Sequence, residues 1–85
     1  MAYRVAISKK AIKQLVKLPT SDYVAIKKTI YTLAETPRPH GCKKLRGRPG
    51  YRIRQGNYRI IYEIFEQRLR VEIIAVGHRK SIYLN

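Results

Sequence analysis

Cysteine, tryptophan and acidic residues are scarce in this chain of 85 residues, which contains one Cys, no Trp and five Asp and Glu against 19 Lys and Arg. A lone Cys42 excludes an internal disulfide and a cysteine cluster for zinc. Five scattered acids form no metal-binding cluster and no carboxylate pair of the kind that glycosidases use. The formal charge of +14 instead favours an anionic partner: nucleic acid, an anionic membrane or an acidic protein.

Long hydrophobic runs are missing as well. No stretch approaches the roughly 20 apolar residues that a membrane-spanning helix needs, and lysines interrupt the N-terminal segment before any apolar run reaches the length of the hydrophobic region of a signal peptide. We therefore expect a cytoplasmic protein without a membrane partner. The hydrophobic fraction of 45% is ordinary for a globular protein, so we expect one folded domain over residues 1–85.

The first part of the chain shows one strand pattern followed by two helical patterns. Apolar residues alternate over residues 3–7, which predicts a half-buried strand. Ser8 is a good N-cap for a first helix, and Thr20 or Ser21 is expected to cap a second helix that runs to about Glu35. The apolar stripes expected in these helices are Ala11, Ile12, Leu15, Val16 and Leu18 in the first and Tyr23, Ile26, Ile30 and Leu33 in the second.

The second part begins with a basic loop rich in Pro and Gly over residues 36–50 and continues as a meander of three strands. The strands are expected over residues 51–55, 58–65 and 69–77, joined by a Gly56-Asn57 turn and a turn at residues 66–68. Their core-facing residues are expected to include Tyr58, Ile60, Tyr62 and Ile64, and then Leu69, Val71, Ile73 and Ala75. The fold class is therefore α+β, with an N-terminal strand and a two-helix hairpin packed on an antiparallel sheet of about four strands.

Three arginines fall on one side of the predicted hairpin. A turn at Gly56-Asn57 pairs Arg54 with Arg59, and alternation then places Arg52 on the same face, away from the helices. Like charges set opposite each other destabilise a sheet. Such a patch can be an ordinary solvated surface, but the segment over residues 36–62 contains eight Lys and Arg and no acid. This absence favours phosphate binding, for which guanidinium groups are well suited.

Further candidates for a site lie in the loop and near the C-terminus. We expect basic side chains of the loop to add RNA contacts: Lys43, Lys44, Arg46 and Arg48. After Gly77, the side chains of His78, Arg79 and Tyr83 could join the arginines, although a surface histidine and an apolar tail residue would look the same. The sequence contains no supported Cys/His or Ser/His/Asp arrangement. Metal-free cleavage of a phosphodiester by the 2′-hydroxyl of RNA stays open.

The order and spacing of several short motifs resemble those of a known family. The chain is similar over nearly its whole length to RelE-type toxins of the RelE/ParE superfamily, from bacterial and archaeal toxin–antitoxin pairs. The motifs that carry the resemblance are the strand over residues 3–7, Thr36-Pro37-Arg38, Lys44-Leu45-Arg46-Gly47, Tyr51-Arg52-Ile53-Arg54, Tyr58-Arg59-Ile60-Ile61-Tyr62, and Val76-Gly77-His78-Arg79 with Tyr83.

The resemblance implies a ribosome-dependent endoribonuclease, or mRNA interferase, that cuts messenger RNA in the ribosomal A site, uses no metal or cofactor, and is held inactive by an acidic antitoxin. By matched position, Arg52 and Arg54 replace two catalytic lysines and grip the scissile region. Arg59 and Arg79 would stabilise the transition-state phosphate, and Tyr83 would orient a base or the 2′-hydroxyl.

One departure from the family pattern concerns proton transfer. Arginine is a poor acid at neutral pH because its pKa exceeds about 12, whereas lysine can donate a proton. His78 is therefore a candidate replacement as general acid. Two other functions stay open: a ParE-type inhibitor of DNA gyrase, which would bind a protein and cut nothing, and a non-catalytic RNA-binding module.

Overall fold

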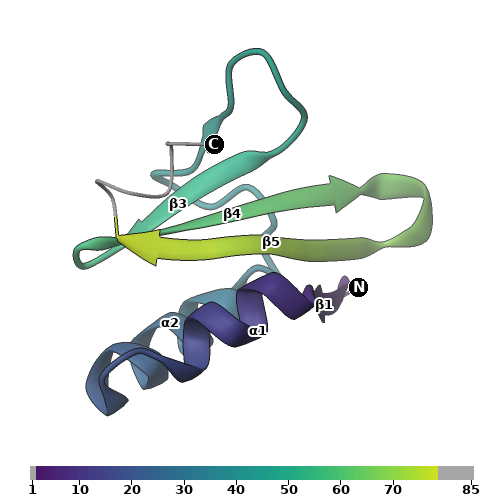
Figure 1. The fold of residues 1–85 in the computed structure, drawn as a ribbon. Helices are drawn as coiled ribbons and strands as arrows, with labels where there is room; N and C mark the ends of the chain where they lie inside the picture. The colour runs from purple at the N-terminus through teal and green to yellow at the C-terminus, as the bar shows by residue number, and fades with distance from the viewer. Residues whose placement is uncertain (1, 79–85) are drawn as a thin grey trace.

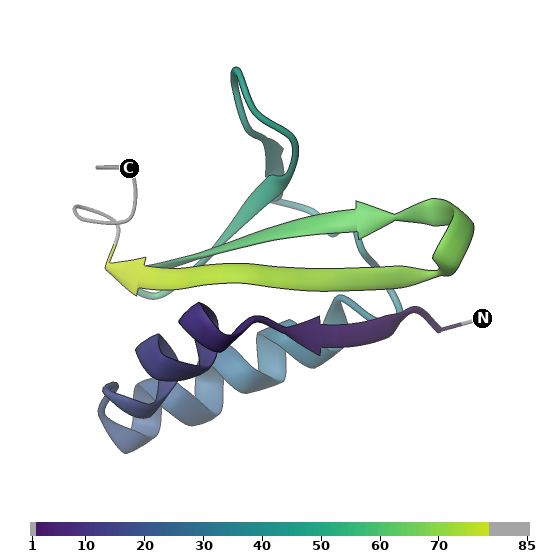
Figure 2. The same ribbon diagram turned by 45° about the vertical axis from the view of Figure 1, so that its right-hand side comes forward.

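The fold is a five-stranded sheet with two helices covering one of its faces (Figures 1 and 2). The structure is a computed structural model and describes residues 2–78. The strand order is β1-β5-β4-β3-β2. The predicted α+β class and helical hairpin are confirmed. The elements are β1 (Arg4–Ile7), α1 (Lys9–Val16), α2 (Thr20–Thr32), β2 (Lys43–Lys44), β3 (Tyr51–Gln55), β4 (Tyr58–Phe65), the 3-10 turn η1 (Glu66–Arg68) and β5 (Arg70–His78).

The sheet is mostly antiparallel and differs from the expected one at its two edges. β1 pairs in parallel with β5, from Arg4 opposite Arg70 to Ile7 opposite Ile73. At the other edge, the two-residue strand β2 pairs with β3 inside a segment that the sequence predicts to be loop. Neither helix of the described part is long and apolar enough to cross a membrane.

Helix α1 is fastened to the exposed edge of β5 by two polar side chains. The Ser8 hydroxyl accepts a hydrogen bond from the Ala11 N–H at 3.1 Å, as predicted for an N-cap, and donates to the Ile74 carbonyl at 2.9 Å. Nearly two turns later, the Gln14 side-chain oxygen accepts a hydrogen bond from the Val76 N–H at 2.6 Å. Helix α1 and its N-cap therefore supply hydrogen bonds to the backbone of β5 beyond the end of β1.

A β-bulge interrupts the pairing of β4 with β5. Tyr62 pairs with Ile73, but the preceding residue Ile61 pairs with Ala75, so Ile74 is the extra residue. The bulge turns Ala75 away from the helices. The prediction that Ala75 and Leu69 belong to the core face is wrong: Ala75 lies opposite Ile61 on the other face, and Leu69 is exposed at the end of η1.

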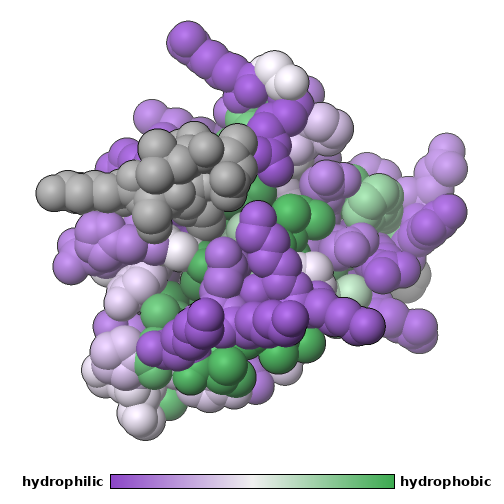
Figure 3. All heavy atoms as spheres, viewed as in Figure 1, coloured by the Kyte–Doolittle hydropathy of each residue, from purple (hydrophilic) through white to green (hydrophobic). Residues whose placement is uncertain are grey.

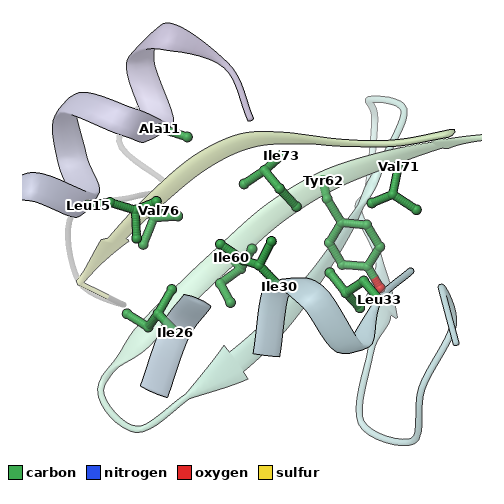
Figure 4. Packing of buried hydrophobic residues seen from close by; sticks show 10 residues of the cluster. All are labelled: Ala11, Leu15, Ile26, Ile30, Leu33, Ile60, Tyr62, Val71, Ile73 and Val76. Carbon is green, nitrogen blue, oxygen red and sulfur yellow. The ribbon is translucent and has the colours of Figure 1, made fainter. Parts of the chain in front are cut away.

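Side chains from α1, α2, β4 and β5 fill the core between the helices and the sheet (Figure 4). Ile26 and Ile30 in α2 and Leu33 at its C-cap are fully buried, as the predicted stripe requires. In α1, by contrast, Ile12 is 47% exposed and Val16 is 69% exposed, although both belong to the expected stripe. Helix α1 lies at the edge of the sheet and buries only a narrow strip of its surface. The core cluster comprises Ala11, Leu15, Ile26, Ile30, Leu33, Ile60, Tyr62, Val71, Ile73 and Val76.

The ends of α2 also differ from the sequence prediction. Pro19 occupies the N-cap position and no side chain caps the helix, so the prediction of a Thr20 or Ser21 cap is wrong. Proline fixes φ at a value compatible with a helix start, which allows the helix to begin without a polar cap. The helix ends at Thr32, and turns continue the chain to Glu35.

The Glu66 carboxylate holds together segments that are distant in the sequence. Its two oxygens accept hydrogen bonds from the Tyr3 hydroxyl and the Arg38 guanidinium, each at 2.8 Å. Arg38 also donates to the Tyr51 hydroxyl at 3.1 Å. The hydrogen bonds from Tyr3 and then from Arg38 hold the pKa of the Glu66 carboxyl below its ordinary value. Protonation of Glu66 would therefore weaken the attachment of the loop that leads to β2.

We predict that Glu66→Gln lowers the melting temperature at pH 7 and that this difference disappears in acid. Because folding lowers the pKa of Glu66, its contribution is present above the unfolded-state pKa of about 4.3 and is lost as the pH falls through the lower folded-state value. Thermal unfolding from pH 7 to pH 3 measures the effect. Glu35→Gln, which removes an exposed carboxylate elsewhere, is the control. A difference between Glu66→Gln and wild type that does not change with pH would contradict the prediction.

Candidate functional site

The β3–β4 hairpin carries three arginines on the face of the sheet that the helices leave open. The predicted register is present: Arg54 pairs with Arg59 and Arg52 pairs with Ile61. Ile53 and Ile60, one position along each strand, pack with the core cluster on the helix side. Directly opposite side chains have Cβ atoms about 4.5–5.5 Å apart. We call the surface formed by Arg52, Arg54 and Arg59 the arginine face.

The turn at the end of the hairpin fixes this register. Gly56 has φ of +60°, whereas Asn57 is not among the described residues with positive φ. A two-residue loop with positive φ at its first central position is a type II′ turn, which matches the twist of paired strands. A Cβ at Gly56 would meet no atom within 4 Å, so this backbone conformation, and not lack of space, is the reason for glycine.

Strand β2 places further basic side chains beside the arginine face. Lys43 pairs with Arg52, and the loop from β2 to β3 projects away from the sheet (Figure 2). Hydrophilic side chains project from this loop in Figure 3. A surface hollow of about 410 Å³, which we call the basic hollow, is lined by Lys43, Lys44, Leu45, Arg46, Arg52 and Arg59. The structure thus brings five of the predicted site residues together, while Arg48 and Arg54 are exposed outside the lining of the hollow.

The loop beside the basic hollow is held by close backbone contacts. The Leu45 N–H donates a hydrogen bond to the Gly50 carbonyl at 3.0 Å, which closes the loop over residues 45–50. Gly50 has φ of +116°, and a Cβ there would lie 2.9 Å from the Tyr62 carbonyl oxygen. Any other residue at position 50 would push the loop away from β4. Burial raises the pKa of the Tyr62 phenol, which donates a hydrogen bond to the Pro37 carbonyl at 2.7 Å and anchors the start of the basic segment.

His78 does not join the arginine face. It pairs with Tyr58, and the two rings meet edge to face with centroids 5.9 Å apart. Tyr58 packs against the core cluster, so this contact lies on the helix side of the sheet. Gly77 is the residue opposite Arg59. The other two predicted site residues of the C-terminal segment, Arg79 and Tyr83, lie outside the described residues.

Two features of the charged surface escape the sequence analysis. The pairing of Lys43 with Arg52 depends on a two-residue strand, for which the sequence carries no periodic signal. A second basic cluster at the other end of the open face comprises Arg4, Arg68 and Arg70. Of these three, the sequence indicates only the side of the sheet on which Arg4 lies, through the alternation around it. Within residues 2–78, no group of three His, Cys, Asp or Glu side chains is arranged to hold a metal ion.

Comparison with known proteins assigns the chain to a family. The family model described as "ParE toxin of type II toxin-antitoxin system, parDE" matches residues 5–83. The mRNA interferase toxin RelE of Escherichia coli is 31% identical over 83 residues, which cover 94% of this chain and 86% of that protein. The chain is a RelE-type toxin of the RelE/ParE superfamily. The resemblance drawn from the sequence motifs is therefore confirmed.

Solved structures of RelE-type toxins share the fold. The RelBE2 toxin–antitoxin complex from Mycobacterium tuberculosis contains a chain that matches with a TM-score of 0.84 and 29% identity, covering 93% of each chain. The RelE–RelB complex from Pyrococcus horikoshii matches with a TM-score of 0.82 and 31% identity, covering 95% of this chain and 99% of that one. These matches place the present toxin in a type II toxin–antitoxin system.

We predict that Arg54→Gln stabilises the toxin by about 0.2–1 kcal/mol at low ionic strength, because it removes one of two like charges that lie opposite each other. The gain should shrink in 1 M salt, where the Debye length is about 3 Å. Urea denaturation, which adds no ions, measures both values. Lys28→Gln, at an exposed position away from the ends of α2, is the matched control. Equal stability of Arg54→Gln and wild type at low salt would show that the pair carries no repulsive cost.

Proposed function

We propose that this toxin is a metal-independent endoribonuclease that cleaves messenger RNA in the A site of the ribosome and thereby inhibits translation in the cytoplasm. The observation that carries the proposal is the arginine face and the adjoining basic hollow, where Arg52 and Arg59 line the same surface as three basic side chains of the β2 region. Relatives of this chain are named mRNA interferases, which supports RNA as the substrate.

The proposed reaction uses a nucleophile that the message supplies. The 2′-hydroxyl oxygen bonds to the adjacent phosphorus, and the bond from phosphorus to the 5′-oxygen of the next nucleotide breaks. The 2′-hydroxyl gives up its proton, and the leaving 5′-oxygen gains one. The products are a 2′,3′-cyclic phosphate and a 5′-hydroxyl. Negative charge grows on the phosphate oxygens in between, and donors fixed in advance around that phosphate lower the barrier.

The described residues supply charge stabilisation and orientation. Arg59 and Arg52 would contact the scissile phosphate, and Arg54 would hold the neighbouring nucleotide. We also propose that Lys43, Lys44, Arg46 and Arg48 follow the backbone of the message, and that Arg79 and Tyr83 complete the site. A guanidinium stays charged at neutral pH and so acts on charge and not as an acid. The ring of His78 lies against Tyr58, and we assign it no proton transfer in this arrangement.

The proposed protein partner is an acidic antitoxin. The structures from M. tuberculosis and P. horikoshii are of toxin–antitoxin complexes, and a toxin with a formal charge of +14 favours an acidic partner. An apolar hollow of about 250 Å³ between the two helices offers a place for an amphipathic helix. Its lining combines the exposed Ile12 and Val16 with a basic rim residue, and consists of Ile7, Ile12, Leu15, Val16, Tyr23 and Lys27.

Inhibition of DNA gyrase is the second candidate function, because the matching family model is described as ParE toxin. A gyrase inhibitor would bind its target as a protein surface and would leave RNA intact. The two functions therefore give different results with the same protein preparation.

Cleavage of messenger RNA on programmed ribosomes tests the proposed function. Wild type should cut the message at a codon-positioned site, and Arg59→Ala should lower the cleavage rate about 100-fold or more, the usual cost of removing one donor to a charged transition state. Lys28→Ala, on the exposed face of α2, is the control and should cut at the wild-type rate. Gyrase supercoiling is measured in parallel. Inhibited supercoiling with an intact message would replace the endoribonuclease with the gyrase inhibitor.

We predict that Val16→Glu weakens antitoxin binding at least 10-fold, because it removes apolar contact from the hollow and adds a charge there. Cleavage on ribosomes should stay at the wild-type rate, since Val16 lies on the helix side of the sheet. Val24→Glu, at an exposed position of α2 that does not line the hollow, is the matched control. Titration calorimetry with the antitoxin encoded beside the toxin measures both variants. Equal affinities would place the antitoxin on another surface.

A further inference from the structure

The open face of the sheet carries a second basic cluster at the end away from the hairpin turn. Arg4, Arg68 and Arg70 line a surface hollow of about 410 Å³ together with Ala2 and Leu69. Arg4 and Arg70 are paired neighbours on the parallel strands β1 and β5, and Arg68 comes from the turn η1 just before β5. Hydrophilic side chains gather in Figure 3 at this end of the molecule, where β4 turns into β5. We call these three residues the distal arginine cluster.

The backbone that presents the cluster is strained. Leu69 is the one non-glycine residue of the described part with positive φ, at 47°, a conformation that L residues rarely adopt. Its carbonyl accepts a hydrogen bond from the Arg4 N–H at 2.7 Å, which ties the turn to the start of β1. Strained residues are concentrated at functional sites, because the surrounding structure must hold them in place. Here the turn that contains Leu69 places Arg68 at the same hollow as Arg4 and Arg70.

The cluster keeps hydrogen-bond donors for an anion. Glu72 is the acid nearest to it in the sheet, and its Oε1 lies 3.9 Å from Arg70 NH2, a long contact for an ion pair. The buried Nε of Arg70 has no hydrogen-bond partner among the described residues. Arg4 and Arg68 are exposed. Three guanidinium groups around an open hollow suit a phosphate, which accepts paired N–H donors from arginine.

Acidic residues separate this cluster from the arginine face. Glu63 and Glu72 are paired on β4 and β5, on the same open face and between the two groups of arginines. Arg59 pairs with Gly77 and Phe65 pairs with Arg70, so the two groups lie six residues apart along β4, or about 20 Å. A single RNA strand running between them would pass over the two carboxylates and be repelled. The arrangement therefore fits two separate RNA segments better than one continuous strand.

We infer that the distal arginine cluster binds a backbone phosphate of ribosomal RNA, while the arginine face binds the message. This inference rests on the proposed function, because it takes the ribosome as the place of action. The cluster would orient the toxin on the ribosome, so that the arginine face meets the message in one fixed position. Phosphate contacts of this kind fix position and register without reading a sequence.

The test measures the affinity of the toxin for ribosomes without message, as a function of salt concentration. In the triple variant Arg4→Gln, Arg68→Gln and Arg70→Gln, the affinity at low salt should fall at least 10-fold. The slope of log K against log salt should become shallower by about 0.7–0.9, because one phosphate contact is lost. The triple variant Lys9→Gln, Lys10→Gln and Lys13→Gln removes the same charge from the exposed face of α1 and should change the affinity less than about 2-fold.

A double variant, Arg4→Gln and Arg68→Gln, keeps the contact of Arg70 with Glu72 and protects the test from a folding defect of the triple variant. It should show a smaller change in slope in the same direction, with an unchanged melting temperature. The cleavage rate at saturating ribosome concentration should fall in both variants, because the toxin is no longer held in one orientation toward the message.

Three results would overturn the inference. The first is equal ribosome affinity of the arginine and lysine variants. The second is a loss of affinity only for ribosomes that carry message, which would assign the cluster to the message, and the third is a loss of antitoxin binding alone, which would assign it to a protein partner. The proposed function fails separately. A wild-type toxin that binds ribosomes but does not cut the message would refute the endoribonuclease, while the binding series would still decide whether the cluster contacts ribosomal RNA.

Discussion

The register between β3 and β4 is the constraint on which both the core and the candidate site depend. Because side chains alternate across a strand, the pairing that buries Ile53 and Ile60 under the helices also sets Arg54 against Arg59 on the open face. Full burial of Ile60 contributes about 1.5–3 kcal/mol, to which the partly buried Ile53 adds, whereas the repulsion of a charge pair costs about 0.2–1 kcal/mol. Burial of the isoleucines therefore outweighs the repulsion between the arginines and determines the register. In this hairpin, regular strands and one glycine with positive φ at the turn are enough to bring the three arginines together.

The two layers of the molecule expose surfaces of different chemistry, which suit different kinds of partner. On the open face, charges alternate along the sheet from the arginine face, through Glu63 and Glu72, to the distal arginine cluster. On the helix side, Ile12 and Val16 leave apolar surface exposed beside lysines. RNA and an antitoxin helix would thus meet different surfaces of the same small protein. An antitoxin that also reaches the open face would have to compete with the charge of the message, and an acidic segment is well suited to do so.

Much of the fold follows from patterns along the chain, and the differences come from contacts between distant segments. The hairpin register, the Ser8 cap and the stripe of α2 depend on local spacing and were predicted. The parallel pairing of β1 and the bulge at Ile74 were not, because each is set by pairing with another strand. The strand β2 was not predicted either, because two residues are too few to give a periodic pattern. The same limit applies to the site. Alternation predicts that Arg52 and Arg59 share a face, but nothing local indicates that Lys43 lies beside them or that the ring of His78 turns to the helix side.

The side chain of Gln14 has a consequence for how the toxin behaves in solution. Beyond Ile73, no strand of the described residues pairs with the outer edge of β5, and the amide oxygen of Gln14 accepts a hydrogen bond from the Val76 N–H there. A helix residue thereby occupies a hydrogen-bonding position that a further strand would need. Covering an edge in this way is one means by which proteins avoid edge-to-edge aggregation. The sheet can grow there only if α1 moves away.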